Sequence, residues 1–321
     1  MLNILEDLKN NKLKKVAGDA SFRKFYRIKI KNKNYILVHC QKQKNNNLFR
    51  YAKINNFLRK KKLLAPKLYK LNIKSNYMIM QDFGFKTYYD VLKKSNKKLE
   101  IYKKIISCLT QIQSIKINLK SKSTISQVYS KKILFRESNL FFEWYVSKYI
   151  KDKKIVKIFQ SKINKILSKI FSKIFFPNNC FVHRDFHVSN LMPVHNKVGI
   201  IDSQDSLIGN PAYDVASLVD DVRIKTSPKL KNQILKYYFS KCKNLFKQNE
   251  KLFRNDFDIF AVQRGLKIIG IFTRLHVRDK KPGYLSYMPY AWKLLHSRLK
   301  NPLFKELNVV LNRYLPVHKR K

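Results

Sequence analysis

One short segment of the chain carries residues whose types and order suit phosphoryl transfer. His183, Arg184 and Asp185 are followed by Asn190, and Asp202 lies twelve positions further on. Phosphoryl transfer needs a carboxylate that accepts the proton of the acceptor hydroxyl, and oxygen ligands that hold Mg²⁺ against nucleotide phosphates. The order H-R-D-x-x-x-x-N with a later Asp serves these tasks in phosphoryl-transfer enzymes. The segment therefore predicts a metal–phosphate site.

Acidic residues are scarce in this chain, so their clustering here is informative. The sequence has 20 Asp and Glu residues against 69 Lys and Arg residues, for a formal charge of +49. Asp185, Asp202 and Asp205 nevertheless lie close together along the chain. His187 and Gln204 accompany them, and each either contacts the substrate or stabilises the loop. The cluster favours a catalytic segment over a set of turn residues.

A turn that covers nucleotide phosphates is expected just before the first clear strand. Gly18, Asp19, Ala20 and Ser21 occupy that place. The start of an ordinary hairpin would have similar residues, so both alternatives stay open.

The cation that usually faces the α- and β-phosphates is missing from its usual place. The strand predicted at Tyr35–Cys40 contains no lysine, and Leu48–Leu64 contains no glutamate to pair with one. Either Arg23 or Arg27 supplies this charge, or the phosphates rely on Mg²⁺ and backbone N–H groups. We favour an arginine.

A DFG tripeptide lies far from the catalytic segment. Met80 and Gln81 precede it, and its first residue, Asp82, precedes Asp185 by 103 positions. The metal-binding DFG of protein kinases follows the catalytic loop, so this one has another role. We interpret it as a hinge between a β-rich and a helical segment, where backbone groups hold an adenine edge. A simple connector is the alternative.

The elements that must position these residues are a β-rich segment and a series of helices. Alternating apolar residues and turn signals predict strands and one helix before Gly84: strands near Tyr26–Ile30, Tyr35–Cys40, Lys67–Leu71 and Tyr77–Gln81, a turn at Asn32–Asn34 and a helix within Leu48–Leu64. After Gly84 apolar residues recur at spacings of three and four, which predicts helices. The catalytic segment interrupts them as a loop and a β-hairpin around His195–Lys197.

The helix after this hairpin is expected to begin at Asn210 and Pro211, a suitable cap and first residue. Asp214, in its first turn, is expected to be a structural anchor. The order of elements predicts an α+β, protein-kinase-like bilobal fold. Residues 1–84 would form a small β-rich N-terminal nucleotide-binding lobe, and residues 85–321 a larger, mainly helical lobe for catalysis and substrate binding.

The distribution of charge indicates which partners to expect, and the spacing of the cysteines indicates the redox compartment. The lysines are spread along the chain, which indicates a solvated surface or steering of anionic substrates, and no specific nucleic-acid partner is expected. The four cysteines are far apart and include no CxxC pair, as expected of free thiols in a reducing compartment. Lysines interrupt every apolar stretch, so we expect no membrane span and a soluble, cytoplasmic protein.

The segments VHRDFHVSNLM and IIDSQDSLIGNPAYDVASLVDD resemble the aminoglycoside phosphotransferase/choline kinase superfamily. Within it, GDASFRKFYRI, the DxQD form of the metal motif and QRGLKIIGIFTRLHVRDKKPGYLSYMP are similar to the bacterial anomeric kinases of N-acetylmuramate and N-acetylglucosamine in cell-wall recycling. These motifs extend from about residue 17 to residue 290, so the resemblance covers most of the chain.

The resemblance implies roles for individual residues. Asp185 would be the catalytic base, and Asn190 and Asp202 the Mg²⁺ ligands. Gly18–Arg23 would cover the phosphates of ATP. The chain departs from the family at Ser203, where an aromatic residue usually follows the metal aspartate. The sugar side would be shaped by one helix and the loop after it, at Arg264, Arg274 and Arg278–Lys280.

The sequence therefore predicts an ATP- and Mg²⁺-dependent kinase for a hydroxyl of an amino sugar, by resemblance the anomeric hydroxyl of N-acetylmuramate or N-acetylglucosamine. A phosphotransferase for an aminoglycoside, choline or homoserine is the nearest alternative, although a chain of charge +49 would repel a cationic aminoglycoside. From another class, the alternative is a basic nucleic-acid-binding protein on a kinase scaffold. Intact Asp185, Asn190 and Asp202 argue against such a loss of catalysis.

Overall fold

The computed structural model describes the whole chain except residues 1–12, 14, 18–22, 41–46, 243–248 and 321. The chain forms two compact units. Unit 1 comprises residues 1–126 and 188–206, and unit 2 comprises residues 127–187 and 207–321. Asp185 thus belongs to unit 2, whereas Asn190 and Asp202 belong to unit 1. The division into lobes at residue 84 stays a prediction.

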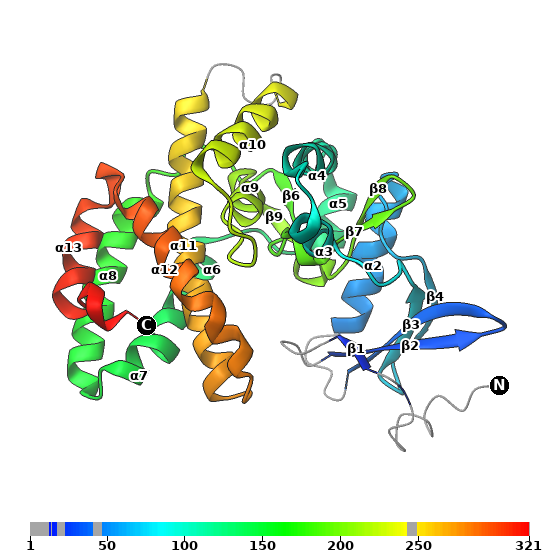
Figure 1. The fold of residues 1–321 in the computed structure, drawn as a ribbon, viewed down its shortest axis with the longest axis horizontal. Coiled ribbons are helices and arrows are strands. Elements are labelled where there is room, and N and C mark those ends of the chain that lie inside the picture. The colour runs from blue at the N-terminus through cyan, green and yellow to red at the C-terminus, as the bar shows by residue number, and fades with distance from the viewer. Residues whose placement is uncertain (1–12, 14, 18–22, 41–46, 243–248, 321) are drawn as a thin grey trace. The chain divides into compact units, whose positions relative to one another are not determined.

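Unit 1 is built on a five-stranded antiparallel sheet in the order β1-β2-β3-β5-β4 (Figure 1). Its strands are β1 (Lys15–Ala17), β2 (Arg23–Ile30), β3 (Lys33–Cys40), β4 (Leu68–Asn72) and β5 (Tyr77–Gln81). Lys31 and Asn32 form the β2–β3 turn, with φ of 45° and 60°, as in type I′ hairpins. The turn predicted at Asn32–Asn34 is therefore displaced, because β3 already begins at Lys33.

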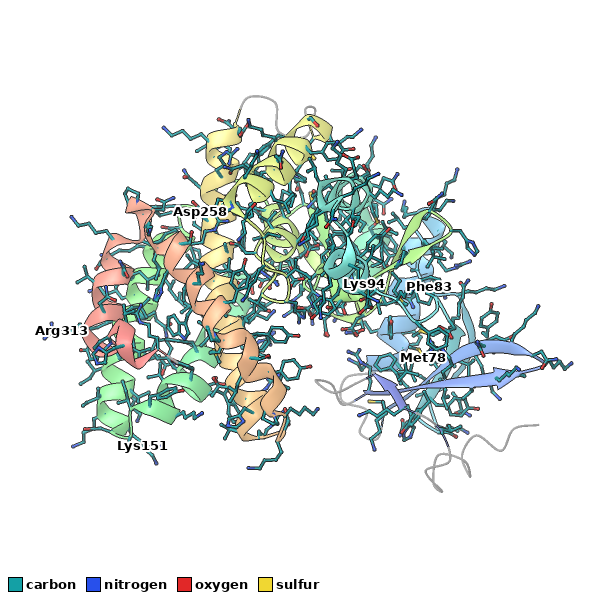
Figure 2. The ribbon with its side chains drawn as sticks, in the orientation of Figure 1. Met78, Phe83, Lys94, Lys151, Asp258 and Arg313 are labelled. Carbon is teal, nitrogen blue, oxygen red and sulfur yellow. The ribbon has the colours of Figure 1, made fainter. Side chains whose placement is uncertain are left out.

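Helix α2 (Asn47–Lys60) supplies the main apolar cover of this sheet. Its Tyr51 shares a buried cluster with Val38 and with Met78, which Figure 2 labels on β5. The helix ends at Lys60 rather than at the predicted Leu64, because Lys62 takes a left-handed backbone with φ of 61°.

The rest of unit 1 consists of short helices and the hairpin of the catalytic segment. These elements are α3 (Tyr88–Lys94), α4 (Lys98–Gln113), α5 (Leu119–Ile125), the 3₁₀ turns η2 (Val188–Asn190) and η3 (Ser203–Asp205), and strands β7 (Leu191–Val194) and β8 (Lys197–Ile200). The Phe83 ring lies so close to β8 that a Cβ on Gly199 would come within 2.8 Å of it. The DFG tripeptide thus packs internally on the hairpin.

Unit 2 is mainly helical, with one two-stranded sheet. It contains α6 (Lys131–Leu140), the π-helix η1 (Phe141–Val146), α7 (Ser147–Tyr149), α8 (Lys153–Phe171), β6 (Cys180–Val182), β9 (Leu207–Gly209), α9 (Ala212–Val219), α10 (Pro228–Lys241), α11 (Glu250–Val277), η4 (Pro282–Tyr287), α12 (Met288–Leu299), η5 (Pro302–Phe304), α13 (Lys305–Tyr314) and η6 (Val317–Lys319). Strands β6 and β9 flank the catalytic loop, so their pairing fixes both ends of the segment.

Helix α11 forms the centre of unit 2, in contact with α6, η1, α9 and α12 (Figure 1). It is buried on nearly all sides, which explains why it lacks a single apolar stripe. At Gly270 the helix approaches the backbone at the end of α6 so closely that a Cβ would lie 2.3 Å from the carbonyl of Leu140. Only a glycine permits this contact between two backbones.

The α+β class predicted from the sequence is confirmed. The N-terminal sheet is followed by a mainly helical remainder, and strand β5 has the predicted bounds. All four cysteines are free and buried. Among the described residues, none of the helices is long and apolar enough to span a membrane.

We predict that Gly270→Ala destabilises the protein, because the added methyl group meets backbone atoms that cannot move aside. We expect a loss of about 3 kcal/mol in the free energy of unfolding, measured by urea titration. Gly265→Ala in the same helix is the matched control, since the atoms nearest to its Cβ would belong to the Leu295 side chain, at 3.2 Å or more. The control is expected to change stability by less than about 1 kcal/mol. Equal losses in the two variants would contradict the packing argument.

Candidate active site

The catalytic loop of unit 2 is held through its backbone. Asp214, fully buried at the start of α9, accepts hydrogen bonds from the backbone N–H groups of His183 (2.6 Å) and Arg184 (3.0 Å). Arg264 on α11 donates to the Arg184 carbonyl at 2.7 Å. Arg184 needs this support, because its φ of 73° is unfavourable for a residue with a side chain. The loop therefore presents Asp185 in a fixed direction, with Asp214 in the anchoring position that its place in the sequence predicts.

The carboxylate of Asp185 stays ionised. Burial acts to raise its pKa, but the positive charges of Lys267, Arg264 and Arg184 outweigh burial and hold the pKa well below its usual range. Asp185 is therefore available as a hydrogen-bond and proton acceptor at physiological pH.

His187 is buried and held in the neutral form. Burial and the nearby Arg223 guanidinium lower its pKa to about 3. Its backbone N–H donates to the Asp185 carbonyl at 3.0 Å. Arg223 also forms an ion pair of 3.1 Å with Asp221. A neutral imidazole at this place can donate or accept a hydrogen bond but adds no charge next to Asp185.

In unit 1, the two predicted metal ligands meet at one end of the β7–β8 hairpin. The backbone N–H of Ile201 donates to the Asn190 carbonyl at 3.1 Å, so Asn190 pairs across the hairpin with the residue that precedes Asp202. Asp202 has a φ of 63°, and its N–H donates to the Tyr51 hydroxyl at 2.9 Å. One carboxylate and one amide oxygen are donors that Mg²⁺ accepts together with nucleotide phosphates. Among the described residues, no group of three or more His, Cys, Asp or Glu side chains is placed to hold a metal ion.

Arg23 and Arg27, the two candidates for the missing phosphate-binding cation, have different partners. Arg23 donates to Asn47 at 2.9 Å and to the Asp202 carboxylate at 3.2 Å. Arg27 forms an ion pair with Asp82, donates to the Gly84 carbonyl at 2.7 Å, and lies over the Phe85 ring. Arg27 is thus a structural residue, and Arg23 is the arginine that contacts Asp202, the predicted metal ligand.

The other predicted nucleotide contacts are engaged within the fold. Met80 is buried in the core of unit 1, and the Gln81 side chain accepts a hydrogen bond from the Lys67 N–H at 3.3 Å. Asp82 accepts from Arg27 and from the Gly84 N–H. Any contact with adenine here would therefore use backbone groups. The predicted phosphate-covering turn, Gly18–Ser21, lies outside the described residues.

The predicted substrate contacts fall into two groups. In unit 1, Gln204 is buried and donates to the Asp205 carboxylate at 2.9 Å. In unit 2, Arg264 and His187 lie in the surroundings of Asp185, and the Arg264 guanidinium also lies over the Tyr213 ring. Arg264 supports the catalytic loop, so its observed role is positional.

Four charged residues near the catalytic loop were not singled out from the sequence: Glu137, Asp221, Arg223 and Lys267. Glu137 binds Arg184 and Lys267, and Asp221 pairs with Arg223. The scarcity of acids could have pointed to Glu137, since an acid in a Lys-rich helix is unusual in a chain with 20 acidic residues.

Comparison with protein families and curated proteins gives consistent matches. A family model described as "Phosphotransferase enzyme family" matches residues 12–247. A Pseudomonas aeruginosa protein named N-acetylmuramate/N-acetylglucosamine kinase is 26% identical over 300 residues, which cover 92% of this chain and 86% of that protein. A Neisseria meningitidis protein of the same name is 24% identical over 279 residues, covering 85% and 81%.

Solved structures similar to this chain have low sequence identity, so they show the fold alone. An ADP-bound aminoglycoside phosphotransferase has a TM-score of 0.62 at 16% identity, over 95% of this chain and 99% of that one. A choline/ethanolamine kinase family protein from Mesorhizobium loti has a TM-score of 0.65 at 11% identity, over 96% and 99%. The predicted protein-kinase-like fold is confirmed.

We predict that His187 does not titrate between pH 5 and 8, because its pKa of about 3 keeps the ring neutral throughout that range. The pH dependence of its ring C–H signals in NMR spectra measures this directly. A His187→Gln variant assigns the signal, and the protein unfolded in urea, where histidine titrates near pH 6.5, is the control. A midpoint above pH 5 in the folded protein would contradict the burial argument.

Proposed function

The chain belongs to the phosphotransferase enzyme family, and we propose that it is an ATP-dependent kinase for the anomeric hydroxyl of N-acetylmuramate or N-acetylglucosamine. The observation that carries the proposal is the ionised Asp185, presented on a loop whose backbone is fixed at three points. The names of the curated relatives support the choice of sugar. Use of ATP is consistent with the ADP bound in a structural neighbour and implies a cytoplasmic reaction.

Asp185 would act mainly by orienting the sugar hydroxyl. Its lowered pKa makes it a weak base, but the loose transition state of phosphoryl transfer requires little proton transfer before the bond to the leaving group lengthens. A fixed carboxylate can hold the hydroxyl in line with the phosphorus and accept its proton as the new P–O bond forms. The anomeric hydroxyl is the most acidic on the ring, which suits such an acceptor.

Asn190 and Asp202 would hold Mg²⁺, whose chemistry is to neutralise charge on the transferring phosphoryl group. The donor set fits a hard cation that also binds nucleotide phosphates. Five positions separate Asp185 from Asn190, so the chain itself limits the distance between their Cα atoms to roughly 18 Å. We propose that these residues act on one bound substrate pair.

Arg23 would take the place of the missing phosphate-binding lysine. Its guanidinium is buried, fixed by Asn47 and directed at the carboxylate of Asp202. A planar cation beside a metal ligand can bind the phosphate oxygens that the metal also contacts.

An aminoglycoside is a poorer fit as acceptor. The acids of the Asp185 surroundings are already engaged: Asp214 accepts backbone N–H groups, Asp221 pairs with Arg223, and Glu137 binds two cations. A polycationic substrate would instead need acids that face it.

The product of the reaction tests the proposed function. We expect ATP-dependent conversion of N-acetylmuramate or N-acetylglucosamine to a 1-phosphate, which releases phosphate in mild hot acid and no longer reduces. The Asp185→Asn variant is the control, and its kcat is expected to be lower by about 10²–10⁴-fold. An acid-stable, reducing product would contradict the anomeric assignment, and absence of any sugar phosphate would contradict the kinase proposal.

Measurements of nucleotide binding with and without Mg²⁺ distinguish the proposed role of Arg23 from that of Asp202. We predict that Arg23→Met weakens ADP binding about tenfold both with Mg²⁺ and with EDTA, because the guanidinium contacts phosphate without the metal. Asp202→Ala should weaken binding only when Mg²⁺ is present, since it removes a metal ligand. Calorimetry under the two conditions measures both effects, with thermal melting as the control for folding. If Arg23→Met binds ADP as the wild type does, another residue or the backbone must hold the phosphates.

A further inference from the structure

Glu137, on α6, is the centre of a buried polar cluster that includes Arg184 of the catalytic loop. Its carboxylate accepts hydrogen bonds from Lys267 at 2.9 Å and from the Gln263 amide at 3.0 Å, and it also binds Arg184 and the Tyr129 hydroxyl. The side chain is buried. A carboxylate with this many donors is fixed in position.

The charges of this cluster do not balance without Asp185. Glu137 faces two cations, Arg184 and Lys267, whose charges also act on the Asp185 carboxylate. Burial acts to raise the pKa of Glu137, but the same two cations outweigh it and keep the group ionised. Glu137 and Asp185 therefore share the field of Arg184 and Lys267, and Arg264 acts on Asp185 as a further cation.

The geometry determines which carboxylate holds these cations. Lys267 also donates to the Tyr213 hydroxyl at 3.1 Å, and this bond, with its bond to Glu137, directs the ammonium group toward α6 and α9. The lysine side chain is long and flexible, so without an anion at position 137 its charge would move to the other anion within its field. An Asp185 carboxylate in an ion pair with Lys267 or Arg184 would no longer direct its oxygen at an acceptor hydroxyl.

We propose that Glu137 is a positioning residue for the phosphotransfer reaction, which holds Arg184 and Lys267 so that the carboxylate of Asp185 remains available to the acceptor hydroxyl. This inference rests on the proposed function, because it assigns Asp185 to the hydroxyl. Glu137 acts through these two cations and does not touch the substrate.

The test is a set of three variants whose kcat, KM values and ADP affinity are compared with the wild type. Glu137→Gln keeps the shape of the side chain but removes its charge, and kcat is expected to fall about 100-fold, with KM for the sugar and Kd for ADP changed less than threefold. Lys267→Met in the Glu137→Gln background removes the competing cation, and kcat is expected to recover at least tenfold. Lys267→Met alone completes the cycle.

A merely structural role would give a different pattern, because removing a second member of a packed cluster would leave the double variant no better than the single one. The proposal is overturned if folded Glu137→Gln retains a third of the wild-type kcat, or if the double variant shows no recovery. If Glu137→Gln does not fold, Glu137→Asp with and without Lys267→Met gives the same comparison, with an expected loss of about tenfold and recovery in the double variant. Wild-type turnover is measured first: absence of sugar phosphate contradicts the proposed function, and the variants are then compared in ATP hydrolysis with water as acceptor.

Discussion

The hydrogen bonds between Asp214 and the backbone of the catalytic loop are the interactions on which the site in unit 2 depends. Arg184 adopts a left-handed backbone, which costs energy for a residue with a side chain. Two N–H groups that donate to one buried carboxylate offset that cost, because a buried carboxylate left without these donors would be costly. Burial raises the pKa of Asp214, whereas these hydrogen bonds act to lower it. The direction of Asp185 is thus set by a residue 29 positions later in the chain.

Other buried acids of unit 2 organise the fold in the same way. Asp256 accepts hydrogen bonds from two backbone N–H groups, of Phe175 and Phe176, each at 2.8 Å, and from the Asn210 amide at 2.7 Å. Asp220, on the loop after α9, binds both Lys231 and Arg298. In a chain of charge +49, a few carboxylates therefore join segments that would otherwise repel one another. Loss of any of them would leave buried donors unpaired, which costs more than the bond itself contributes.

Two arginines on one strand of unit 1 have different roles because their side chains meet different partners. Arg23 and Arg27 lie four positions apart on β2, so their side chains leave the same face of the sheet. Arg27 meets Asp82 and the Phe85 ring and holds the segment after β5. Arg23 meets Asp202, at the end of the catalytic hairpin. The first contact stabilises a connection, and the second places a cation beside Asp202, which is why we propose Arg23 as the phosphate-binding residue.

The sequence by itself determined the fold class, strand β5, the catalytic segment and the candidate roles of Asp185, Asn190 and Asp202, because periodicity and motif spacing are local properties of the chain. Only the tertiary structure assigned Arg23 rather than Arg27 to Asp202, and only it brought Glu137 to Arg184 and Lys267. These pairs lie 179, 47 and 130 positions apart, respectively. No local pattern specifies which distant residue a charged side chain will meet, since that choice follows from how the helices and strands pack.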